Sequence, residues 1–191
     1  MKLLSLFLIW TLLPFVSRAD PNEEAQDFCK ISEAARLDKI IITIHFDSLP
    51  ILLQAELQHY YLWETDDGNP PRDIYGFITD LNQDGRLEYC ICDQAGSGTG
   101  GPMYMIFSQI SGSWHPIYHS QGSLHLLSSR TEWPLLVSLS RSGMEIFWKT
   151  YYAFESGSYE PTMIESYVRG KISKKRIKKP KALPTMTPNV E

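Results

Sequence analysis

The second half of the chain consists of short aromatic and β-branched runs separated by turn residues, and this pattern constrains the fold more than any other feature. Beginning at Ile74, the runs are IYGFIT, LEYCIC, MYMIFSQI, SWHPIY, PLLVSLS, MEIFWKTYYAF and YEPTMIESYV. Short strands at regular spacing are typical of antiparallel sheets. We therefore predict a mainly β fold of the α+β class.

The chain from residue 20 to residue 73 has a different character. Residues 20 to 38 are polar and favour a helix, with Ser32 as a candidate N-cap of the segment SEAARLDKI. The nearly continuous β-branched residues from Ile40 to Ile44 predict a strand that is buried on at least one face. Apolar residues at helical spacing in LPILLQAELQHYYLW, which Pro50 opens, predict a second helical segment.

One short sequence recurs within the β half. SGSWHP, at residues 111–116, returns 45 residues later as SGSYEP, at residues 156–161. Each copy follows an aromatic run and leads into another, so the repeat predicts two blade-like β units, residues 74–122 and 123–168. The alternative is coincidence, because Ser-Gly-Ser between two strands is an ordinary hairpin turn.

The segment TDLNQDGRLEYCIC, from Thr79 to Cys92, carries the clearest chemical motif. Calcium takes about six to eight oxygen ligands. Gly85 permits the sharp turn that brings oxygen-bearing groups together. The motif therefore predicts a structural calcium site formed by the side chains of Asp80, Asn82, Asp84 and Glu88 and the backbone carbonyl of Arg86. The alternative is a polar hairpin turn without a metal.

The surroundings of this loop exclude an EF-hand. An EF-hand needs a bidentate acid at its twelfth position, which is Ile91 here, and a helix on each side. The motif and its hydrophobic flanking strands instead resemble the calcium loop of FG-GAP or VCBS-type repeats, the blades of integrin-α-like propellers. The resemblance implies a calcium loop between strands, and binding or scaffolding more often than catalysis. It covers one loop well, whereas a closed propeller needs at least about four blades.

Three cysteines lie outside the apolar N-terminus: Cys29, Cys90 and Cys92. Cys90 and Cys92 are two residues apart, so they share a face if they lie on a strand. A disulfide from Cys29 to either of them is one interpretation, and three small buried hydrophobic residues is the other. The C-x-C spacing lacks the second half of a zinc site.

The N-terminus has the layout of a secretory signal peptide. Lys2 precedes an apolar run from Leu3 to Val16, and small residues follow before Asp20. We predict a signal peptide over residues 1–19, a globular domain over residues 20–168, and a secreted or periplasmic location. The run is short for a membrane span, although an uncleaved anchor is the alternative. We expect no transmembrane anchor after cleavage.

Charge is distributed unevenly. Residues 20–168 contain 21 acidic and 8 basic residues, a balance of −13, whereas residues 169–191 have a balance of +7. The tail, residues 169–191, is predicted to be disordered and to bind an anionic surface, or else to lie against the acidic body. Ile172 and Ile177 favour a membrane surface over nucleic acid. The candidate binding residues are Lys171, Lys174, Lys175, Arg176, Lys178, Lys179 and Lys181.

These features predict an exported, non-catalytic binding or structural module that calcium stabilises. Its expected partner is a protein or a carbohydrate, held by aromatic side chains of the β half. Nucleic acid is not expected as a partner. The alternatives are a hydrolase or hydrolase inhibitor without a recognisable sequence motif, and a protein that works through its basic tail.

Overall fold

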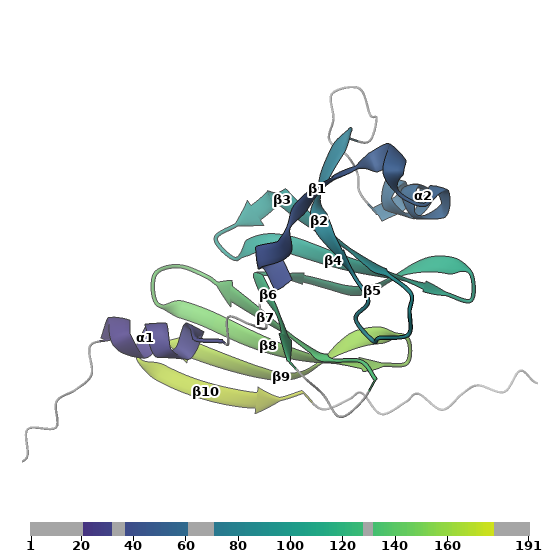
Figure 1. Ribbon diagram of the computed structural model, residues 1–191. Helices are drawn as coiled ribbons and strands as arrows, with labels where there is room; N and C mark the ends of the chain where they lie inside the picture. Colours follow the sequence, from purple (N-terminus) through teal and green to yellow (C-terminus); the bar gives the residue numbers. More distant parts are fainter. Residues whose placement is uncertain (1–20, 32–36, 61–70, 128–131, 178–191) are drawn as a thin grey trace, which may run out of the picture.

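The computed structural model describes residues 21–31, 37–60, 71–127 and 132–177 (Figure 1). The described helices are α1 (Pro21–Cys29), α2 (Ile51–Tyr60) and the short 3-10 helices η2 (Leu37–Ile40) and η3 (Phe46–Ser48). The first five strands are β1 (Ile42–His45), β2 (Asp73–Thr79), β3 (Glu88–Gly98), β4 (Gly101–Ile110) and β5 (Ser113–Gln121). The other five are β6 (Ser123–Leu127), β7 (Leu135–Arg141), β8 (Ile146–Glu155), β9 (Ser158–Val168) and β10 (Lys171–Arg176).

The strands form two antiparallel sheets of five strands each. Sheet 1 has the order β1-β2-β3-β4-β5, and sheet 2 has the order β10-β9-β8-β7-β6. Each strand pairs with its neighbour in the sequence, so each sheet is a simple meander. The prediction of a mainly β fold with antiparallel sheets and an N-terminal helix is confirmed.

The two sheets pack against each other over one apolar core. Sheet 1 contributes Phe77, Cys90, Cys92, Tyr104, Ile106 and Tyr118 among others, and sheet 2 contributes Leu124, Leu136 and Tyr159. Tyr118 meets Tyr152 and Tyr159 edge to face, with ring centroids 5.0 and 6.0 Å apart. Such pairs add stabilisation beyond the area that they bury.

A second core lies on the opposite face of sheet 1. Leu53 and Leu57 of α2 pack on Ile91, Phe107 and other apolar side chains of this face. Both leucines are fully buried. Sheet 1 is therefore covered on both faces, by α2 on one side and by sheet 2 on the other, as Figure 1 shows.

The repeated sequence forms two hairpins that match residue by residue. Ser111 and Gly112 between β4 and β5 have φ values of 52° and 87°, and Ser156 and Gly157 between β8 and β9 have 53° and 94°. Positive φ at both central residues is the type I′ geometry that suits tight hairpins.

A bulge also repeats at the same offset. In the first hairpin the register changes between the pairs Ile106↔Tyr118 and Phe107↔Pro116. In the second it changes between Tyr151↔Met163 and Tyr152↔Pro161, with every residue 45 positions later. The repeat is therefore structural in the two hairpins and includes more than the Ser-Gly-Ser turn.

Equivalent faces of the two hairpins do not face each other. Phe107 and Trp114 of the first hairpin lie under α2. Their counterparts in the second hairpin, Tyr152 and Tyr159, lie in the core between the sheets. The units therefore stack front to back.

Gly122 joins the two sheets. It separates β5 from β6 and has a φ of 107°. A Cβ atom here would lie 2.3 Å from the backbone oxygen of Leu139, so a larger residue does not fit. A strand that bends at a glycine can pass from one sheet to the next.

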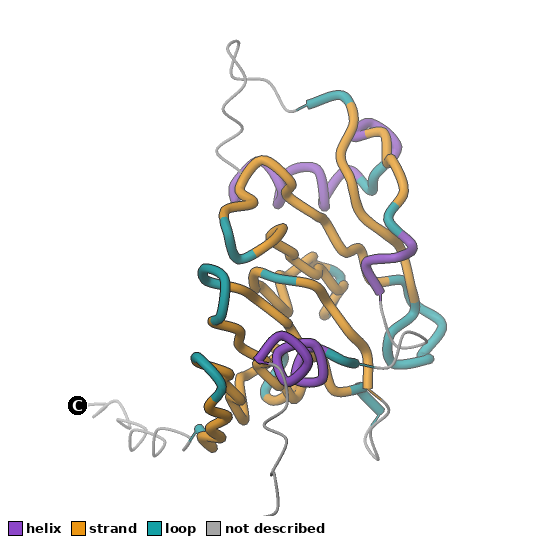
Figure 2. The backbone as a smooth tube through the Cα atoms, turned by 90° about the vertical axis from the view of Figure 1, so that its left-hand side faces the viewer, coloured by secondary structure: helices purple, strands orange, loops and turns teal. Residues whose placement is uncertain are grey.

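The N-terminal segments differ in detail from the prediction. The helix α1 begins at Pro21 and ends at Cys29, before the segment SEAARLDKI. Residues 32–36 of that segment, including Ser32, lie outside the described residues, and residues 37–40 form a 3-10 helix. The first strand begins at Ile42 instead of Ile40. The tube in Figure 2 shows α1 in front of the strands of sheet 2.

Candidate metal loop and charged surfaces

The candidate calcium loop connects β2 to β3, between the paired residues Thr79 and Glu88. Gln83 and Gly85 have φ values of 61° and 85°, so the chain coils tightly at these positions. Glycine adopts this conformation without strain, and a residue such as Gln83 does so at some cost. The predicted strand–loop–strand arrangement is present.

Hydrogen bonds within the loop hold the predicted ligand side chains around it. The carboxylate of Asp80 accepts the backbone N–H groups of Asp84 and Gly85 at 3.1 and 2.9 Å. Asp84 accepts the N–H of Arg86 at 2.8 Å and the side-chain amide of Asn82 at 3.1 Å. These bonds lower the pKa of Asp84, with the Arg86 amide as the largest cause. The loop thus keeps Asp84 ionised.

Glu88 differs from the other candidate ligands because it is buried. Its side chain is 1 % exposed, and it accepts the N–H of Leu81 at 2.7 Å and the hydroxyl of Ser108 at 3.1 Å. Burial is the largest cause of a raised pKa at Glu88, and the charges of Asp84 and Asp80 raise it further. A buried acid with negative neighbours needs a proton or a cation.

Tyr159, from sheet 2, lies within electrostatic reach of this buried acid. Its side chain is 6 % exposed, and its hydroxyl has no hydrogen-bond partner among the described residues. Burial raises the pKa of Tyr159, and the charge of Glu88 raises it further. Leu81 of the loop packs in the core between the sheets, so this end of the loop approaches the second unit.

The chemical nature of the candidate ligands fits calcium, but their arrangement in the structure does not form a ready metal site. Three carboxylates, one amide and a carbonyl are all oxygen ligands, as calcium prefers. However, the described residues contain no group of three or more His, Cys, Asp or Glu placed to hold a metal. Calcium binding at Asp80, Asn82, Asp84, Arg86 and Glu88 stays a prediction.

The described residues contain no disulfide among Cys29, Cys90 and Cys92, so the interpretation as a disulfide is not borne out. Cys90 and Cys92 share a face, as predicted, and are buried in the core between the sheets. Burial raises the pKa of both Cys29 and Cys90. Cys29 lies outside that core, beside Arg141 and Phe147, so no partner thiol is within reach.

The basic tail is partly a strand. The prediction of disorder from Arg169 is wrong for residues 171–176, which form β10 and pair with β9. Lys171, Lys174, Lys175 and Arg176 therefore lie on the edge of sheet 2, and all six residues of β10 are exposed. Backbone pairing, instead of apolar burial, holds this strand. Lys178, Lys179 and Lys181 lie outside the described residues.

The outer face of sheet 2 carries a row of charges across three strands. Lys149 of β8 pairs in register with Glu165 of β9, which pairs with Lys174 of β10. Glu165 and Lys174 form an ion pair of 2.6 Å, and Tyr151 donates to Glu165 at 3.1 Å. The ammonium of Lys149 lies 4.7 Å from the ring centre of Phe28 in α1, a cation–π contact.

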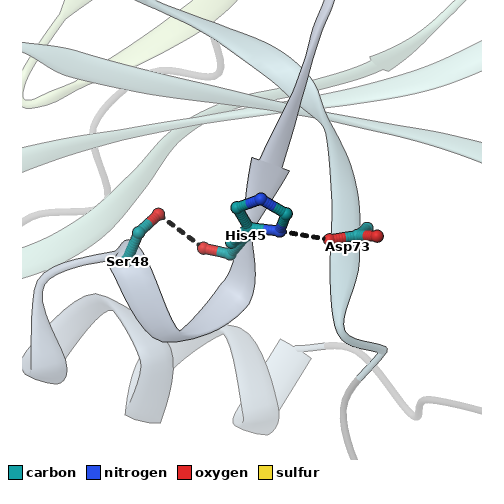
Figure 3. A network of polar contacts seen from close by, with 3 residues as sticks. All are labelled: His45, Ser48 and Asp73. Carbon is teal, nitrogen blue, oxygen red and sulfur yellow. Dashed lines mark hydrogen bonds and ion pairs between the residues drawn. The ribbon is translucent and has the colours of Figure 1, made fainter.

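Three residues that the sequence did not single out form a polar network on β1, η3 and β2 (Figure 3). His45 Nδ1 bonds to Asp73, while the hydroxyl of Ser48 donates to the backbone carbonyl of His45 at 2.6 Å. A nucleophilic serine would direct its hydroxyl at the ring instead. This network fixes the pairing of β1 with β2 and does not form a catalytic triad.

A shallow hollow lies where α1 meets the ends of both sheets. It has a volume of about 260 Å³ and includes Cys29, Arg141, Phe147 and the Gly100–Gly101 turn. No acid and no histidine lines it. The described lining of the hollow therefore lacks a carboxyl or imidazole group for general acid–base catalysis, and Cys29 is its one thiol.

Comparisons with protein-family models, with curated proteins and with solved structures found no match. No helix in the described part of the chain is long and apolar enough to span a membrane.

Proposed function

We propose that this chain is an exported, non-catalytic binding or structural module whose fold is stabilised by calcium at the Asp80–Glu88 loop. The observation that carries the proposal is the buried carboxyl of Glu88, which has negative neighbours and a raised pKa. A calcium ion beside it would supply the missing positive charge.

The proposed site stabilises the fold because its ligands come from both ends of the loop. Asp80, Asn82 and Asp84 belong to the coil, and Glu88 is the first residue of β3. A cation shared among them would fix the end of β3 against the coil.

Two further observations support a module of this kind. Hairpins with the same turn and the same bulge recur 45 residues apart, in units that stack front to back. Repeated antiparallel β units packed against each other are what the resemblance to FG-GAP repeats implies. A protein or carbohydrate partner is part of this proposal.

Calorimetric titration of calcium into the chelator-treated chain from Asp20 onward tests the proposal. Extracellular calcium modules bind with dissociation constants of roughly 0.1–1 mM. At 10-fold excess over the dissociation constant, binding would add about 1.4 kcal/mol to the free energy of unfolding. Thermal melts should shift upward accordingly.

Three variants locate the site. Asp84→Ala and Glu88→Gln should abolish both the heat and the shift, whereas Asp47→Asn, an exposed acid on η3, should change neither. If the unaltered chain gives no heat and no shift, the loop is a hairpin turn closed by its own hydrogen bonds, and the proposal is wrong.

A further inference from the structure

The free edge of sheet 2 gathers positive charge. Five cations lie on or just before β10: Arg169, Lys171, Lys174, Lys175 and Arg176. Lys174 is paired with Glu165. Among the described residues, no ion pair engages the other four, and three more lysines follow within the next five residues of the sequence. β10 lies on the side of sheet 2 away from sheet 1 (Figure 1).

Exposed apolar side chains accompany these cations. Met144 is 85 % exposed, Ile172 is 58 % exposed and Val168 is 39 % exposed. They lie in or beside two neighbouring turns, because the N–H of Arg169 donates to the carbonyl of Glu145 at 3.1 Å and Ile146 pairs with Val168. The end of the sheet therefore presents apolar and basic side chains together.

The acids that face this surface are few. Glu145 lies in the first turn, Glu165 is the partner of Lys174, and Glu24 of α1 lies close to Gly170. The remaining chain is strongly acidic, with a balance of −13 over residues 20–168. Such an asymmetry orients a protein at a negatively charged surface so that its basic edge faces that surface.

We propose that this basic edge, made of β10 and the turns at residues 142–145 and 168–171, docks on an anionic phospholipid bilayer. Lysine and arginine attract the headgroups, and Met144 and Ile172 enter the interface. The apolar side chains decide between partners, since a flexible polyanion would need only the charges. The helix α1 packs at the same end, through Phe28 on Tyr167.

Vesicle sedimentation tests the proposal with the chain from Asp20 onward, which lacks the apolar leader. Vesicles of phosphatidylglycerol and phosphatidylcholine are compared with pure phosphatidylcholine, in chelator so that calcium cannot bridge protein and lipid. We expect binding only to the anionic vesicles, weakened by salt. Each lysine or arginine near an anionic membrane changes the affinity for vesicles about fivefold. The double variant Lys171→Glu/Lys175→Glu should therefore bind anionic vesicles at least ~25-fold more weakly.

The apolar contribution has a matched control. Ile172→Asp should weaken vesicle binding about tenfold or more. Ile51→Asp should have no effect, because Ile51 is 74 % exposed on α2, beside sheet 1. Arg72→Glu is the control for charge, since Arg72 is exposed just before β2. Thermal melts establish that each variant is folded.

Three results would overturn the proposal. The first is no binding, or equal binding to both kinds of vesicle. The second is equal loss in the edge variants and their controls. The third is an affinity for a single-stranded oligonucleotide equal to that for anionic vesicles, together with no effect of Ile172→Asp on vesicle binding. That result would identify a general polyanion site. The calcium titration does not depend on any of these outcomes.

Discussion

Tyr104 in β4 and Lys149 in β8 occupy equivalent positions in the two hairpins, and their surroundings are opposite. Tyr104 is paired with Ser120 and is 1 % exposed in the core between the sheets. Lys149 is paired with Glu165 on the outer face of sheet 2, and each of these two residues lies 45 positions after its counterpart in the first pair. The same face of the same hairpin is thus an apolar interface in the first unit and a charged surface in the second.

This difference shows why, in the described part of the chain, no third sheet packs on the outer face of sheet 2. Units that pack front to back always leave one face without a neighbour, and terminal repeats commonly carry a polar outer face. Here the ion pair of Glu165 with Lys174 and the helix α1, through Phe28 on Lys149, occupy that face. The fold therefore uses one backbone unit twice and changes the side chains where no third sheet follows.

The largest expected effect is at Gly122, the residue that joins the units. In Gly122→Ala, the new Cβ atom would lie 2.3 Å from the backbone oxygen of Leu139, and the residue would keep a φ of 107°, which strains any residue with a side chain. We expect these two effects to lower the free energy of unfolding by about 3 kcal/mol. Urea denaturation measures it. Gly143→Ala, with a φ of 86° and open space around it, should lose only about 1 kcal/mol. Equal losses would show that the close approach does not matter.

The second effect concerns the charged face. Glu165→Gln leaves Lys149, which is 8 % exposed, without its counter-ion, and we expect a loss of about 2 kcal/mol at pH 7. The pKa of Glu165 is lowered, chiefly by Lys174 and Tyr151 acting against burial. Its contribution is therefore present above the ordinary pKa of 4.5 and is lost as the pH falls through the lower pKa of the folded state. Identical pH profiles for the variant and the unaltered chain would contradict this.

The third prediction tests the equivalence of the two hairpins. Gly112→Ala and Gly157→Ala both introduce a side chain at positive φ with nothing within 4 Å. Each should cost about 1 kcal/mol, and the two losses should agree within about 0.5 kcal/mol. A clear difference, measured by chemical denaturation, would show that the hairpins are not equivalent in stability.

The smallest effect distinguishes the loop of the first unit. In chelator, the raised pKa of Glu88 means that the folded state binds the proton more tightly, so stability rises as the pH falls from 7 towards the ordinary value of 4.5. Glu88→Gln should remove this slope and be as stable as the unaltered chain or up to about 1 kcal/mol more stable at pH 7. Calcium would reverse the slope, because a bound cation favours the charged form. Thermal melts over a range of pH, with chelator and with calcium, measure the sign of the stability slope in each condition.

Much of the β half could be predicted because its signals are local. The Ser-Gly-Ser turns, the aromatic runs and Gly85 each act over a few residues, so the hairpins and the position of the candidate loop follow from the sequence. Two strands were missed, β6 and β10. The segment KISKKR of β10 has no apolar alternation, and it becomes a strand only because β9 offers an unpaired edge.

The sequence by itself determined where the chain turns, where the Asp80–Glu88 loop lies and how charge divides between body and tail, since these depend on neighbouring residues. Only the tertiary structure decided which face of each unit is buried, that Glu88 is buried at the end of the loop, and that residues 171–176 of the tail form the edge of a sheet. Those outcomes depend on the stacking of two units, and residues far apart in the sequence determine it.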